Sequence, residues 1–113
     1  MNSHRDAEDG AHDPRKLIAL LGTTGDELAR TLGLDKDATR RMESDDIQRP
    51  IGSMIEVLSK VEPRFGSMIM AYAWYRSEPL SGFSGQTAME LVRCDRAQDV
   101  LTYIDAVNAG VHA

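Results

Sequence analysis

The chain of 113 residues has few of the features that mark secreted and membrane proteins. It contains a single cysteine, Cys94, which cannot form a disulfide within the chain. Its longest uncharged apolar run is MIMAYAWY, residues 68–75, whereas ~20 apolar residues are needed to cross a bilayer. The first residues do not combine a positively charged start with an apolar stretch, so we expect no secretory signal. These observations predict a cytoplasmic protein without membrane contact.

Positive charge and catalytic motifs are also scarce. The chain has 13 Lys and Arg against 18 Asp and Glu, a formal net charge of −5, whereas proteins that coat nucleic acid present a basic surface. It has no glycine-rich phosphate loop, no metal-ligand spacing and no Ser/His/Asp set. Cys94 has no histidine or basic cluster at helical spacing that would activate its thiol. We therefore expect no enzyme activity, no metal and no cofactor.

Helix signals, in contrast, are dense from Pro14 onward. Residues 1–13 carry almost no apolar side chains and predict a disordered tail. Capping residues, prolines and glycines then divide the chain into helical segments with apolar residues at a 3.6-residue period. No segment shows the sustained alternation of a strand. The sequence predicts an all-α fold without a sheet and with about seven short helices, which lie at residues 14–22, 24–33, 36–43, 50–61, 67–76, 87–92 and 95–108.

Individual residues define the ends of these predicted helices. Pro50 suits the first turn of the fourth helix, and Pro63 is expected to stop it. Thr87-x-x-Glu90 is a capping box, in which the side chain of each residue accepts a hydrogen bond from the backbone N–H of the other. Asp95 is expected to cap the last helix.

The segment LARTLGLDKDATRRM, residues 28–42, has the pattern of a helix-turn-helix. Ala29 on the first helix and Gly33 in the turn have the spacing that close packing of two helices requires. On the second helix the exposed residues able to contact DNA are Lys36, Arg40 and Arg41. Acidic residues crowd the same segment and oppose binding to a phosphate backbone. The pattern predicts the helix-turn-helix shape more firmly than it predicts DNA binding.

The C-terminal part combines a helix ending near Trp74, a turn with Pro79 and two glycines, a capped short helix and a long final helix. This order resembles the C-terminal toxin-binding domain of the Xre/MbcA/ParS antitoxins, whose partners are toxins with a RES domain. The resemblance covers residues 65–113, and residues 14–64 more loosely, where family members carry an Xre-like helix-turn-helix. Its matching positions are Trp74, Pro79, Leu80, Gly82, Thr87, Leu91, Val100, Ile104, Gly110 and Val111. Ala88 and Arg96 depart from the proline and the nearby glycine frequent in the family.

The resemblance implies a division into a tail (residues 1–13), an Xre-like helix-turn-helix region (residues 14–64) and a toxin-binding domain (residues 65–113). It implies an antitoxin of a type II toxin–antitoxin system that binds and blocks a RES-domain toxin, which degrades NAD. The C-terminal end of such an antitoxin lies at the toxin's active-site cleft, so the expected toxin-binding residues are Asn108, Gly110, Val111, His112 and Ala113. Trp74, Pro79 and Thr87 are expected to be structural anchors, since a tryptophan that ends an apolar helix usually fills space between helices.

Two other interpretations stay open. In the first, the chain is a DNA-binding repressor whose C-terminal half only mediates oligomerisation, with operator DNA as its partner. In the second, it is a helical interaction protein with an unrelated partner. The antitoxin interpretation allows autoregulation of its own operon as well, and it expects a homo-oligomer or a hetero-oligomer with the toxin. In either alternative His112 is an ordinary exposed residue near the chain end.

Overall fold

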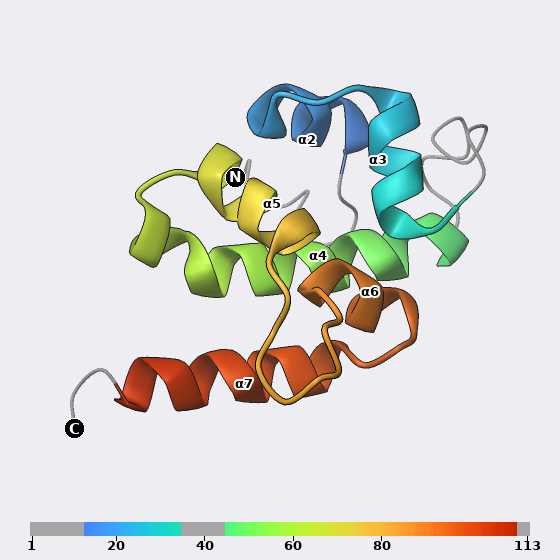
Figure 1. Ribbon diagram of the computed structural model, residues 1–113. Helices are drawn as coiled ribbons and strands as arrows, with labels where there is room; N and C mark the ends of the chain where they lie inside the picture. The colour runs from blue at the N-terminus through green and yellow to red at the C-terminus, as the bar shows by residue number, and fades with distance from the viewer. Residues whose placement is uncertain (1–12, 35–44, 111–113) are drawn as a thin grey trace, which may run out of the picture. The chain divides into compact units, whose positions relative to one another are not determined.

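The computed structural model describes residues 13–34 and 45–110, and these residues form six helices (Figure 1). They contain no strand, only an isolated antiparallel bridge between Pro79 and Thr87, so the all-α expectation is confirmed for the part described. The predicted tail up to residue 12 and the predicted helix 36–43 lie outside the described residues. None of the helices in the described ranges has the length and apolar content needed to span a membrane.

The chain divides into two compact units, residues 1–52 and residues 53–113. We call them unit 1 and unit 2. The division falls inside helix α4 (Asp45–Phe65), whereas the boundary predicted from the sequence, between residues 64 and 65, falls at the end of that helix.

In unit 1, helices α2 (Pro14–Leu21) and α3 (Gly25–Leu32) pack against each other. The Asp13 carboxylate accepts the Arg15 N–H at 2.9 Å, and the Thr24 hydroxyl accepts the Glu27 N–H at 3.1 Å, so each helix begins at the residue expected to cap it. Gly22 and Gly33 end the helices in the left-handed conformation, with φ of 67° and 76°. Local capping chemistry therefore sets all four ends.

The first helix and the turn of the predicted helix-turn-helix lie in this unit. Ala29 is only 1% exposed, and Leu28 and Leu32 are also buried, as a close helix contact requires. After Gly33, the Leu34 N–H donates to the Ala29 carbonyl at 2.9 Å and tightens the turn. The second helix of the motif falls in the undescribed residues 35–44, so the completed motif stays a prediction.

Helix α4 is longer than predicted, and both expected proline boundaries were wrong. It runs from Asp45 to Phe65, so Pro50 lies beyond its first turn and Pro63 lies before its end. An internal proline costs ~3 kcal/mol because it removes a hydrogen bond and crowds the preceding turn. This cost is offset by an apolar face with full helical periodicity that is at most 2% exposed, made of Met54, Val57, Leu58 and Val61. Gly66, with φ of 82°, ends the helix instead.

Unit 2 contains the rest of α4 together with α5 (Met68–Ser77), α6 (Ala88–Arg93) and α7 (Ala97–Gly110). Helix α6 packs against both α5 and α7, and lies between them in Figure 1. Each helix buries an apolar face, and the residues that do so on α5, α6 and α7 are Ala71, Tyr72, Tyr75, Ala88, Leu91, Val100, Leu101 and Ile104.

The connection from α5 to α6 is a tight turn closed at its base. Pro79 and Thr87 form the isolated bridge, and the Leu80 N–H donates to the Gln86 carbonyl at 2.9 Å. Gly82 and Gly85 have φ of 85° and 81°, in the left-handed region of backbone conformation that residues other than glycine adopt at a cost. The Thr87 hydroxyl accepts the Glu90 N–H at 3.1 Å while the Glu90 carboxylate accepts the Thr87 N–H at 3.0 Å. The predicted capping box is therefore complete, and it starts α6 directly after the turn.

The joint between α6 and α7 differs from the prediction. Asp95 was expected to cap α7, but it has φ of 64° and ends α6 in the left-handed conformation. The Arg96 N–H donates back to the Leu91 carbonyl at 2.9 Å, which is the closure that usually follows a glycine. Asp is among the few residues other than glycine that tolerate this conformation. The family resemblance places a frequent glycine near this position, and Asp95 takes the conformation that a glycine would favour.

Candidate functional site

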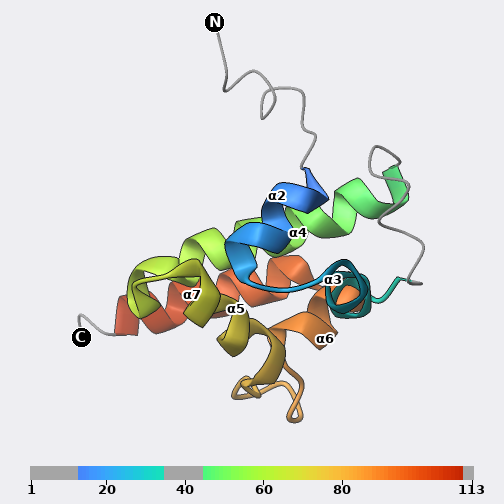
Figure 2. The ribbon, with the colours of Figure 1, turned by 90° about the horizontal axis from the view of Figure 1, so that it is seen from above.

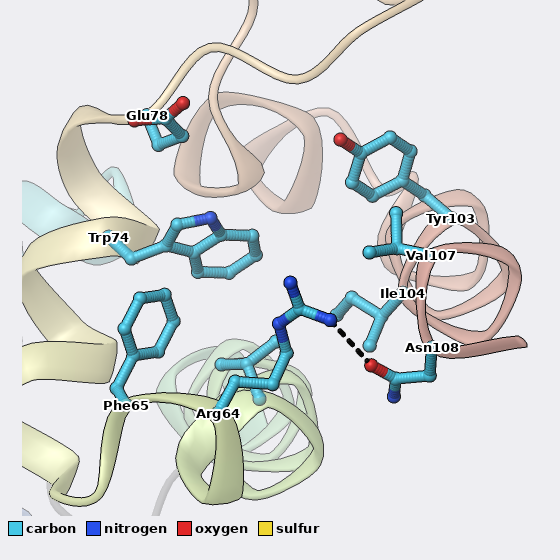
Figure 3. A pocket seen from close by; sticks show the side chains of 9 residues that line it. Arg64, Phe65, Trp74, Glu78, Tyr103, Ile104, Val107 and Asn108 are labelled. Carbon is cyan, nitrogen blue, oxygen red and sulfur yellow. Dashed lines mark hydrogen bonds between the residues drawn. The ribbon is translucent and has the colours of Figure 1, made fainter. Parts of the chain in front are cut away.

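A pocket of about 340 Å³ opens in unit 2 where α4 and α5 end and the C-terminal half of α7 passes (Figure 3). Pockets that bind ligands begin at ~300 Å³. Its lining residues come from these three helices and from Glu78, which directly follows α5; they are Val61, Arg64, Phe65, Trp74, Glu78, Tyr103, Ile104, Val107 and Asn108. The pocket therefore joins a C-terminal residue assigned to partner binding, Asn108, to the tryptophan expected to be an anchor.

Two polar contacts hold α7 against the C-terminal half of α4. Lys60 Nζ lies 2.7 Å from Asp105 Oδ1, and one turn further along Arg64 Nη1 donates to Asn108 Oδ1 at 3.0 Å. Because later residues of one helix pair with later residues of the other, the two helices run alongside in the same direction (Figures 1 and 2). The second contact is part of the pocket wall, and the first lies outside it.

The Arg64–Asn108 contact determines the polarity of this end of the pocket. Arginine has no acceptor, so the amide atom facing Arg64 must be the oxygen of Asn108, and the Asn108 NH₂ group is left as a donor. Among the described residues, this bond is the one polar contact of the Arg64 guanidinium, whose other N–H groups remain for a ligand. Arg64 and Asn108 together therefore offer hydrogen-bond donors.

Aromatic rings form the opposite wall. The Trp74 indole packs on Phe65 with ring centroids 6.1 Å apart and an interplanar angle of 40°. Helix α5 buries Tyr72 and Tyr75 in the core, and Trp74 is only half-buried. Figure 3 shows the indole extending from α5 toward the Arg64 side chain, with Glu78 on the far side of the pocket from Asn108. Trp74 lies in the pocket wall, and the buried aromatic residues of α5 are the two tyrosines.

Tyr103 connects the pocket to the turn between α5 and α6. Its ring meets Phe83 edge to face, with centroids 5.9 Å apart and planes at 78°. The Arg96 guanidinium also lies 5.5 Å from the Phe83 ring centroid, a cation–π distance. The turn that follows Pro79 is therefore fixed to α7 by Phe83, and this contact positions Tyr103 at the pocket.

One residue of α5 close in sequence to Trp74 has a shifted pKa. Burial raises the pKa of Tyr75, and Tyr72 adds to this effect while Arg93 opposes it, so the Tyr75 phenol stays neutral at physiological pH. In the described ranges no group of three His, Cys, Asp or Glu side chains is placed to hold a metal ion. The pocket combines one cation, one carboxylate and aromatic surface, which suits non-covalent recognition of another molecule.

The remaining residues predicted from the sequence divide into those that the structure places and those outside it. Gly110 is exposed at the end of α7, two residues after Asn108. Pro79 is exposed in the bridge that closes the turn, and Thr87 is only 9% exposed and caps α6. The predicted residues outside the described ranges are Val111, His112 and Ala113 for the toxin contact and Lys36, Arg40 and Arg41 for DNA.

Sequence reasoning missed Arg64, Phe65, Glu78 and Tyr103 as pocket residues. The expected stop at Pro63 put Arg64 and Phe65 outside any helix. On α7 the sequence does indicate part of the pocket. Ile104 and Asn108 are four residues apart, so the apolar Ile104 shares a helix face with the predicted contact residue Asn108. Comparison of the chain with protein-family models, with curated proteins and with solved structures gave no match.

Proposed function

We propose that the chain is the antitoxin of a type II toxin–antitoxin pair, which binds a RES-domain toxin and blocks its NAD cleft with the C-terminal end of α7. The proposal assigns the chain no catalytic role. It rests on the resemblance of residues 65–113 to the toxin-binding domain of the Xre/MbcA/ParS antitoxins.

The observation that best supports this function is that α7 is fixed to the rest of unit 2 along its length, up to the proposed contact residues at its C-terminal end. The first half of the helix is fixed by Val100, Leu101 and Ile104, which are at most 7% exposed. The second half makes the Lys60–Asp105 and Arg64–Asn108 contacts with α4, and the helix continues to Gly110. Contact residues that already lie on an ordered helix, such as Asn108 and Gly110, lose little conformational entropy when they dock, so more of their contact energy contributes to affinity.

The test is co-expression with the product of the neighbouring reading frame, which the proposal expects to be a RES-domain toxin, with cellular NAD as the readout. The full chain is expected to restore NAD and growth, and a chain that ends at Val107 is expected to restore neither. Thr102→Ala is the matched control, because Thr102 is exposed on the same helix and lies outside both the pocket and the proposed toxin contact, so this variant should still protect. Protection by the shortened chain would contradict the blocking mechanism, and loss of NAD in the presence of the full chain would contradict the function itself.

A second function, repression of its own operon, is favoured by α3 and the turn at Gly33. Ala29 is buried and Gly33 is left-handed, as the first half of a helix-turn-helix requires. A double variant, Arg40→Ala with Arg41→Ala, is expected to weaken binding to the operator and to flatten its salt dependence. An unchanged gel shift at several salt concentrations would contradict this second function.

A further inference from the structure

The pocket has a donor end, an aromatic wall and an acceptor end, and these features specify what it can bind. At the donor end the free N–H groups of Arg64 and the NH₂ of Asn108 are available. The Trp74 ring forms the wall, and Glu78 lies at the other end (Figure 3). A carboxylate or a phosphate would satisfy the donor end, because guanidinium groups bind both through two parallel hydrogen bonds; a carboxylate is the one that a protein side chain supplies.

The composition of the wall favours a protein ligand. Trp, Tyr and Arg are the residues that most often dominate protein–protein binding energy, and Arg64, Trp74 and Tyr103 supply one of each here. The pocket is also continuous with the proposed toxin contact, because Asn108 belongs to both. A partner that covers the end of α7 therefore meets this pocket on the same surface.

We propose that the pocket receives an anchor segment of the RES-domain toxin, in which an acidic side chain binds Arg64 and a neighbouring apolar or aromatic side chain stacks on Trp74. This inference rests on the proposed function and extends it from the chain end to a second contact. Glu78, at the far end, disfavours a free anion and favours a segment that brings a donor or a positive charge beside its acidic residue.

Lys60 supplies a matched control for Arg64. Both are on α4, both bind a residue on α7, and each substitution by alanine removes one positive charge and one contact between the helices. Only Arg64 lines the pocket. Both substitutions should weaken long-range electrostatic attraction and helix pairing to a similar extent. A larger loss of toxin affinity for Arg64→Ala than for Lys60→Ala therefore shows that the pocket itself contributes to binding.

The experiment is calorimetric titration of the full-length chain and its variants with the purified RES-domain protein. Arg64→Ala is expected to raise Kd about tenfold or more, and Trp74→Ala about 30-fold, the loss typical of a hot-spot residue. Lys60→Ala should stay within about threefold of the unmodified chain. Arg64→Lys should recover part of the affinity, because it keeps the charge but not the planar fork. Arg64→Ala should also reduce the dependence of Kd on salt.

Three results would overturn this inference. The first is equal Kd for Arg64→Ala, Trp74→Ala and the unmodified chain. The second is an equal loss for Arg64→Ala and Lys60→Ala. The third is a lower mass of the free Trp74→Ala or Arg64→Ala chain by light scattering, which would assign the pocket to a second copy of the chain. If the unmodified chain itself does not bind the toxin, the proposed function fails first. Circular dichroism and thermal unfolding of each variant identify any loss that comes from misfolding.

Discussion

Helices of unit 2 present two different surfaces, a buried apolar core side and a partly exposed pocket side. On the core side, Tyr72 and Tyr75 of α5 and Leu91 of α6 are at most 2% exposed, and these two helices pack against each other. On the pocket side, Trp74 is half-buried and the polar residues Arg64 and Asn108 bind each other at the surface. Neighbouring residues of α5 therefore serve different purposes, since packing needs apolar volume and recognition needs surface that a partner can still cover. Substitutions on the core side should change stability, and those on the pocket side should change binding.

The largest effect on stability is expected for Leu91→Ala. Leu91 has no exposed surface, and removing a fully buried leucine side chain costs about 2–5 kcal/mol, depending on the cavity that remains. Urea unfolding should show this loss of free energy. Asn108→Ala on the pocket side should lose about 1 kcal/mol or less, because it removes one exposed hydrogen bond. Similar losses for the two variants would remove the distinction between the sides.

A second core-side prediction concerns alkaline pH. Because burial raises the pKa of Tyr75 in the folded chain, the unfolded chain ionises this phenol first, above about pH 10. Stability from the neutral phenol is then fully present below that pH and falls by about 1.4 kcal/mol per pH unit above it. Unfolding free energies between pH 9 and pH 11 should show this slope, and Tyr75→Phe should remove it. A Tyr75→Phe chain with the same alkaline slope would show that other groups cause the loss.

Thr87→Ala tests the cap that links the turn to α6. The substitution removes the hydroxyl that accepts the Glu90 N–H, and such a loss costs about 0.5–2 kcal/mol. Thr87→Ser keeps the hydroxyl and should remain close to the unmodified chain. Thermal unfolding of both variants checks this, and equal melting temperatures would mean that the capping box contributes nothing measurable.

The smallest effect is expected for Asp105→Asn, beside the pocket. The Lys60–Asp105 ion pair is 2.7 Å long, but its side chains are 36% and 63% exposed, so solvent screens most of the attraction. We expect a loss of about 0.5 kcal/mol or less, and less still in high salt. A loss comparable with that of Leu91→Ala would mean that the two helices are held together by charge and not by their apolar faces.

The sequence predicts the fold well where local chemistry sets the ends of helices. Thr24, Gly33 and Thr87 begin or end helices where expected, because capping hydrogen bonds and left-handed glycines act within a few residues. It fails at Pro63, where burial of the whole α4 face outweighs the local preference of proline. The pocket is harder to predict, because Arg64, Trp74 and Tyr103 meet only through the packing of three helices. Of the residues that line the pocket, Asn108 is the one that the sequence analysis assigned to partner binding.

We propose that the partner covers the pocket side of unit 2 and leaves the core side unchanged. Amide hydrogen exchange of the chain, free and bound to the RES-domain protein, tests it most directly. We expect slower exchange in the bound state at the end of α5, around Trp74, and over residues 105–110 of α7, with exchange in α6 unchanged. Slowing confined to residues 13–34, or no slowing at all, would contradict it.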